Sequence, residues 1–199
     1  MKINYVIGAF LCVLGCYACS SPKTEVQSPD GHIKMTLTVD ENGKPFYNVS
    51  VDDSLLIENS AMGFTAANGI ILAEGFQVKN TTFSSEDETW TQPWGENKKN
   101  RNHYNEMAVS LTNEDQVQLT LRFRVFDDGI GFRYEYTVPT VDSLLITDEL
   151  TTFRFHRDGT SWSIPASAET YELLYQQQPI SEVETANTPF TFKTADGVY

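Results

Sequence analysis

The sequence predicts an all-β protein, an antiparallel β-sandwich of many short strands. Three observations predict it. Apolar and polar residues alternate with period two in Ile33–Val39 and again in residues 117–126, as in strands with one buried face. Clusters of Asn, Asp and Gly separate these segments, and no long amphipathic helix interrupts them.

The expected strands follow one another closely. Residues 40–44 form a turn in which Gly43 supplies the positive φ, and 46–51 return as the partner of the first strand. Further strands are expected at 54–57, 109–111, 117–126 and 130–136, with 109–111 pairing with 117–126. No internal repeat of fixed period is present.

The last expected hairpin carries charge on one face. Arg122, Arg124, Arg133 and Glu135 alternate with apolar and aromatic residues along the two strands. One interpretation is a solvated sheet face with cross-strand ion pairs. The other is a face covered by another domain.

Composition limits the function classes. The 199 residues include 27 acidic and 14 basic side chains, and the net charge of −13 argues against nucleic-acid binding. Solubility explains most of this acidity, although carboxylates are also the ligands that calcium prefers. The cysteines are Cys12, Cys16 and Cys19, so the rest of the chain has no disulfide framework.

Residues 1–19 resemble a bacterial export leader. One basic residue precedes an apolar run at 5–14, which is too short to span a bilayer comfortably. Cys16 and Cys19 both stand where a lipoprotein cysteine is expected, so either is a candidate for lipidation. No acidic run follows, which favours a periplasmic protein anchored to the outer membrane. Removal of the leader without lipidation and a buried N-terminal segment are the alternatives. Residues 20–26 are expected to form a tether, followed by one domain at 27–199.

The composition of residues 87–106, which are polar and include two tryptophans, predicts a loop. Loops on a rigid β-scaffold are common binding sites, but such a loop could equally pack its tryptophans on the sheet edge. Candidate residues for contact with substrate or with another domain are Trp90, Trp94, Glu96, Arg101, Asn102, His103, Asn105 and Glu106. Glu88, Glu96 and Glu106 could in principle supply the two carboxylates of a glycosidase, but sequence cannot show their separation, and we assign no catalytic residue. His32, His103 and His156 have no metal-ligand spacing.

Several segments resemble the N-terminal domain of glycoside hydrolase family 97. These are 28–31 (SPDG), the tryptophan-containing stretch at 87–106, the 123–135 hairpin (FRVFDDGIGFRYE), and 162–165 (WSIP) leading to Tyr171 and Glu172. The resemblance covers about 27–199. It departs from the family at Gln92-Pro93-Trp94, where the proline commonly stands one place earlier.

The resemblance implies a β-super-sandwich like that of galactose mutarotase, continuing beyond Tyr199 and followed in the family by a catalytic barrel. Family members hydrolyse α-glucosides or α-galactosides with catalytic residues in the barrel. The sandwich lends one glutamate to a calcium ion there, and Glu172 matches it. The expected function is that of an accessory domain that helps shape the pocket for an α-linked oligosaccharide. The alternatives are a stand-alone carbohydrate-binding lipoprotein that uses Trp90 and Trp94, and a purely structural sandwich.

Overall fold

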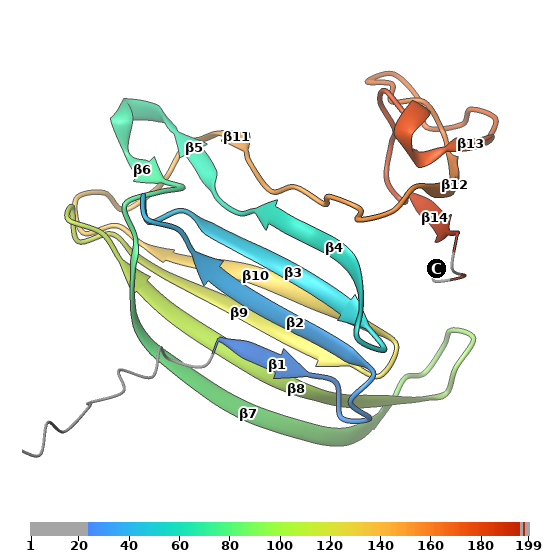
Figure 1. Ribbon diagram of the computed structural model, residues 1–199, viewed down its shortest axis with the longest axis horizontal. Coiled ribbons are helices and arrows are strands. Elements are labelled where there is room, and N and C mark those ends of the chain that lie inside the picture. The colour runs from blue at the N-terminus through green and yellow to red at the C-terminus, as the bar shows by residue number, and fades with distance from the viewer. Residues whose placement is uncertain (1–23, 196, 198–199) are drawn as a thin grey trace, which may run out of the picture.

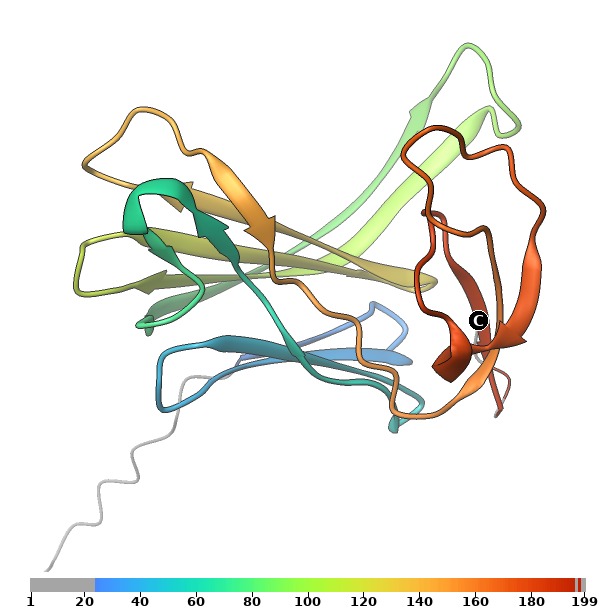
Figure 2. The ribbon, with the colours of Figure 1, turned by 90° about the horizontal axis from the view of Figure 1, so that it is seen from above.

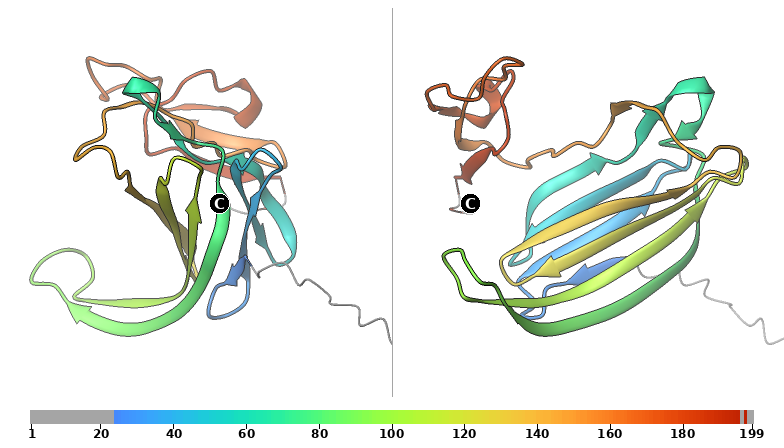
Figure 3. Two further views of the ribbon diagram at one scale, coloured as in Figure 1. Left: turned by 90° about the vertical axis from the view of Figure 1, so that its left-hand side faces the viewer. Right: turned by 180° about the vertical axis from the view of Figure 1, so that it is seen from behind.

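Two four-stranded antiparallel sheets packed face to face form the body of the protein (Figures 1 and 3). The computed structural model describes residues 24–195 and 197, without the side chain of Asn68. The first sheet has the order β1–β2–β3–β4, with β1 Glu25–Gln27, β2 Ile33–Val39, β3 Pro45–Val51 and β4 Ser54–Ala61. The second has the order β10–β9–β8–β7, with β7 Gln77–Thr91, β8 Lys99–Thr112, β9 Gln118–Phe126 and β10 Gly129–Thr137.

The core lies between these sheets, where period-two alternation places it. Along β9, buried and partly exposed residues alternate without interruption. The first sheet contributes Met35, Leu37, Tyr47 and Val49 to this core, and all four are buried. The strands expected from the alternation are therefore confirmed, including the β8–β9 pairing. The second sheet adds Met107, Val109, Leu111, Leu119, Leu121, Phe123 and Val125 to the core.

Two smaller sheets flank the sandwich at opposite ends (Figure 1). One has the order β11–β5–β6, and the other β13–β12–β14. Segment 150–156 runs between them along β4, where the Glu58 N–H donates to the Arg154 carbonyl (2.8 Å) and the His156 N–H to the Leu56 carbonyl (2.9 Å). Their strands and the two short 3₁₀ helices are β5 Phe64–Ala66, η1 Ala67–Gly69, β6 Ile71–Leu72, β11 Ile146–Glu149, β12 Gly159–Ser163, β13 Gln176–Pro179, η2 Ile180–Glu182 and β14 Thr191–Thr194.

The expectation of a loop at 87–106 is wrong. These residues belong to β7 and β8, which form one long hairpin, and only 92–98 connect the strands. β9 pairs with β8 only as far as Tyr104, opposite Phe126, so Lys99–His103 pair with β7 alone. This part, residues 86–103, is called the distal hairpin below; Figure 2 shows it bending away from the first sheet. Polar residues occupy both of its faces, so the alternation that identifies other strands is absent.

The sandwich also begins earlier than expected. β1 starts at Glu25, within the predicted tether, because Val26 is buried in the core. Gly43 has a φ of +75°, as its turn requires, and an added Cβ there would collide with the Phe76 backbone. Cys16 and Cys19 lie outside the described residues. Within 24–195, no helix is long and apolar enough to cross a bilayer.

Candidate functional site

Strand alternation divides the candidate residues of the hairpin between two faces. Directly paired residues share a face, and neighbours in sequence take opposite ones. Trp90, Asn102 and Glu106 therefore lie on the outer face of the second sheet, whereas Arg101, His103 and Asn105 lie on the face directed toward the first sheet. Trp94 and Glu96 belong to the connecting loop. The structure thus brings the eight candidates to one hairpin but not to one site.

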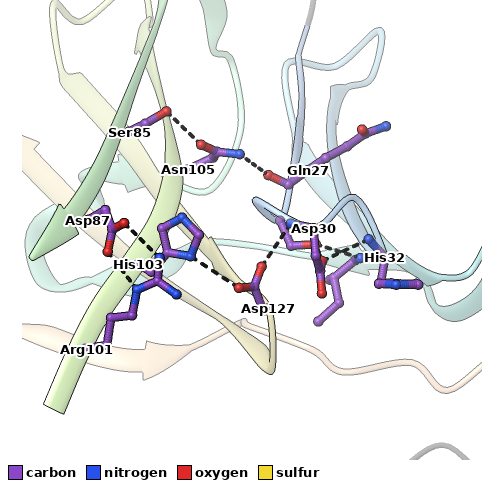
Figure 4. A network of polar contacts seen from close by, with 11 residues as sticks. Gln27, Asp30, His32, Ser85, Asp87, Arg101, His103, Asn105 and Asp127 are labelled. Atoms are coloured by element: carbon purple, nitrogen blue, oxygen red, sulfur yellow. Dashed lines mark hydrogen bonds and ion pairs between the residues drawn. The ribbon is translucent and has the colours of Figure 1, made fainter.

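The inward-facing group joins the two sheets through a set of hydrogen bonds, which we call the polar junction (Figure 4). The Asp30 N–H donates to Asp127 Oδ1 (3.0 Å), and His103 Nδ1 lies 3.2 Å from Asp127 Oδ2. The Asn105 amide donates to the Gln27 carbonyl (2.9 Å). These contacts connect the β1–β2 turn, the β9–β10 turn and β8, and thereby fix the base of the distal hairpin.

Hydrogen bonds in the polar junction lower the pKa of two carboxyl groups, those of Asp30 and Asp87. A hydrogen bond from the Ser28 hydroxyl, together with the His32 N–H, lowers the pKa of Asp30. Arg101 donates twice to Asp87, with both distances 2.7 Å, and this lowers the pKa of Asp87. Because the Arg101–Asp87 pair is exposed, its net contribution to stability is small. The Arg101–Asp87 pair instead fixes the orientation of both side chains, because its two hydrogen bonds are bidentate.

The outer face carries an ion-pair network, which confirms the cross-strand pairs expected for this hairpin. Arg122 donates to Glu106 and, at 2.9 Å, to Glu135, while Arg124 Nε donates to Glu106 Oε2 at 2.8 Å. Burial raises the pKa of Glu106, but the hydrogen bonds from Arg124 and Arg122 together outweigh it and hold the pKa below its usual range. Glu106 is thus a buried structural anion and poorly suited to donate a proton as a catalytic acid.

The tip of the hairpin presents two tryptophans to solvent. Trp94 is 83% exposed and Trp90 50% exposed. A recess of about 470 Å³ lies at the tip, between Trp94 and the side chains of Gln92 and Lys98. The Gln92 amide donates to the Asn97 carbonyl (2.8 Å), which orders the loop. An exposed ring beside amide and ammonium donors can contact a sugar ring or another protein surface.

Glu172 lies in the exposed segment that connects β12 to β13. Its N–H donates to Thr170 Oγ1 (3.0 Å), and its carboxylate has no partner among the residues that the structure describes. Sequence reasoning missed the exposed apolar side chains around it, although the run Tyr-Glu-Leu-Leu-Tyr could have indicated them. They are Tyr171, Leu173, Leu174 and Tyr175. A run of exposed apolar side chains is typical of a segment that contacts another molecule.

A calcium ion takes about six to eight oxygen ligands. Whether Glu172 suits calcium therefore depends on how many other ligands lie near it. In the described part of the chain, no group of three or more acidic, histidine or cysteine side chains could hold a metal ion. Glu172 therefore fits calcium only as one ligand added to a set from elsewhere. Its exposure and its lack of a partner leave the carboxylate available for that role.

Comparisons with known proteins agree with the architecture. A family model described as glycosyl-hydrolase 97 N-terminal matches residues 26–199. A retaining alpha-galactosidase from Bacteroides thetaiotaomicron is 26% identical over 133 residues, which are 67% of this chain and 19% of that protein.

Solved structures give the same result. A glycoside hydrolase family 97 enzyme from Pseudoalteromonas sp. strain K8, solved with panose and with acarbose, has 35% identity and a TM-score of 0.79, covering 86% of this chain and 27% of that one. A beta-arabinopyranosidase has 25% identity and a TM-score of 0.67, with 76% and 26% covered. The chain thus spans less than a third of the length of these relatives. With the sandwich fold and the match over residues 26–199, these similarities show that the chain belongs to glycoside hydrolase family 97 and carries its N-terminal domain.

Proposed function

We propose that this domain is the N-terminal accessory part of an exported α-glycoside hydrolase. In this role it helps to shape the sugar pocket and supplies the Glu172 carboxylate to a calcium ion otherwise held by a catalytic barrel. The observation that carries the proposal is the exposed, unpartnered Glu172 carboxylate within a run of exposed apolar side chains. Such a segment suits burial against a second domain, where a single carboxylate completes a ligand set.

Two of the three relatives support an α-linked oligosaccharide as the substrate class. The curated relative is a retaining alpha-galactosidase, and the Pseudoalteromonas enzyme was solved with panose and with acarbose. We propose an α-glucoside or an α-galactoside for the enzyme to which this domain belongs. We also propose that the protein is periplasmic and held at the outer membrane by lipid on Cys16 or Cys19, with no other membrane contact.

Calcium titration tests the role of Glu172. The 199-residue chain should bind calcium weakly or not at all, since one carboxylate is far short of the ~6–8 oxygens required. In an enzyme that joins this domain to a family 97 barrel, Glu172→Gln should lower calcium affinity about tenfold, as expected when a charged ligand becomes neutral. Isothermal titration calorimetry measures both. Glu169→Gln is the matched control, and equal affinities for the two variants would contradict the assignment.

A second candidate function is that of a carbohydrate-binding module. The exposure of Trp94 at the tip of the distal hairpin favours it, because exposed tryptophans stack on sugar rings. This function needs no partner domain, so glucan binding by the 199-residue chain distinguishes it from the first.

A further inference from the structure

Gly131 lies in the interior of β10, and the described residues give no structural reason for a glycine there. Glycine there weakens a strand by roughly 0.5–1 kcal/mol relative to alanine. Pairing of β10 with β9 is regular from Gly129 to Thr137, so there is no bulge. The φ of Gly131 lies outside the left-handed region, and an added Cβ would meet no atom within 4 Å. The remaining common reason for glycine inside a strand is the close approach of a ligand or another backbone.

The missing side chain leaves a hollow on the outer face of the second sheet. Gly131 is paired directly with Arg124, and two residues further along β10 stands Arg133. A space of about 210 Å³ lies over Gly131, with Phe126 and Phe132 also in contact with it. We call it the arginine hollow; its lining residues are Arg122, Arg124, Phe126, Gly131, Phe132 and Arg133.

The arginines around this hollow are only partly neutralised. Three arginines face two carboxylates, Glu106 and Glu135, which leaves an excess of one positive charge in a chain of net −13. Glu106 cannot turn away to neutralise another group, since its side chain is only 9% exposed and is bonded to Arg122 and Arg124.

Unused donors are located on both sides of the hollow. Arg124 bonds Glu106 through Nε and stacks on the Tyr104 ring, with 4.3 Å to the ring centroid. Its two terminal nitrogens have no partner among the described residues. Arg133 bonds Glu135 through Nε (2.8 Å) and Nη2 (2.6 Å), which leaves Nη1 free within the same part of the chain. Free guanidinium nitrogens beside an open space suit a planar anion.

We propose that the arginine hollow binds a carboxylate, presented by a Glu or Asp side chain of a protein surface that docks on the outer face of the second sheet. The charge excess and the free donors of Arg124 and Arg133 select an anion, and the forked geometry of guanidinium matches a carboxylate. The hollow is smaller than the ~300–1,000 Å³ of sites that enclose small molecules, so it fits one side chain better than an oligosaccharide. The proposal goes beyond the proposed function, because it requires neither calcium nor Glu172.

A titration followed by NMR tests this site in the 199-residue chain. The probe is N-acetylglutamate α-amide, and the neutral probe of the same shape is N-acetylglutamine amide. The Nε–H signals of Arg124 and Arg133 should shift and saturate with the glutamate probe but not with the glutamine probe. The Arg154 signal, from an exposed arginine next to Glu58 on the first sheet, is the internal control.

Two variants and one matched control locate the binding. Arg124→Gln removes the free guanidinium donors of Arg124, and Gly131→Leu fills the space while keeping every arginine. Gly131→Leu tests the hollow even where Arg124→Gln lowers stability. Each should weaken glutamate binding about tenfold, Arg124→Gln because a charge-assisted hydrogen bond is lost and Gly131→Leu because the leucine side chain occupies the space that the carboxylate needs. Arg154→Gln should leave it unchanged.

Three results would overturn the proposal. Equal shifts with the two probes would show that charge is not recognised. Unchanged binding in Gly131→Leu would show that the hollow is not the site. Stronger binding of glucuronate than of the glutamate probe would show that the site recognises an acidic sugar and not the side chain of a docked protein. None of these results bears on calcium binding by Glu172, so this proposal and the proposed function can fail separately.

Discussion

Arg122 shows how a charged side chain is held on the outer face of a β-sheet. It bonds Glu106 on β8 and Glu135 on β10, so one guanidinium connects three strands. The hydrogen bond from Arg122, aided by Arg133, lowers the pKa of Glu135 from 4.5 to about 2. A carboxyl group with a depressed folded-state pKa stabilises the fold above its ordinary pKa, and this contribution is lost as the pH falls through the folded-state value.

Glu135→Gln should therefore lower the free energy of unfolding at pH 6 and have a much smaller effect near pH 2. We expect a loss of about 1 kcal/mol, because Glu135 is partly exposed and solvent screens the pairs. Urea unfolding at intervals from pH 6 to pH 2 measures the difference from the native chain. It should shrink between pH 4.5 and about 2. A difference that stays constant with pH would exclude the ion pairs as its source.

The long hairpin marks where prediction from sequence succeeds and where it fails. β2, β3, β9 and β10 were predictable because burial of one face imposes alternation on their residues. The distal hairpin has both faces polar, so its sequence has the composition of a loop, and its strands are identified by the pairing of β7 with β8 in the structure. The separation of Trp90 from Arg101 onto opposite faces follows from that pairing and was likewise invisible. Motif order nevertheless identified the family, which the match over 26–199 confirms.

Asp127 controls the base of the distal hairpin, and its removal should loosen that element. Asp127→Ala removes the acceptor for the Asp30 N–H and the contact with His103. Amide hydrogen exchange in residues 86–91 and 99–103 should then accelerate by about tenfold, as expected when one hydrogen bond to a charged group is lost. Asp128→Ala, in the same turn, is the control. The same acceleration in both variants would mean that the turn, and not the polar junction, holds the hairpin.

At the scale of the whole molecule, two exposed features project from the sandwich: the hairpin tip with Trp94 and the segment with Glu172. Under the proposed function this domain acts together with a second domain, so the 199-residue chain should show no measurable binding to α-glucan. Affinity electrophoresis in glucan-containing gels measures this. Retardation that disappears with Trp94→Ala, but persists in the control Phe83→Ala, would favour the carbohydrate-binding module instead.

The length of the distal hairpin would amplify a small rotation at its base into a larger displacement at its tip. Lys99–His103 extend past the end of β9 and pair with β7 alone. At about 3.4 Å per residue these five residues place the loop roughly 17 Å from the base. A rotation of about 10° at the polar junction would therefore displace Trp94 by about 3 Å, comparable to the length of a hydrogen bond. A small rotation around Asp127 would thus be enough to make or break a contact between Trp94 and a ring or surface at the tip.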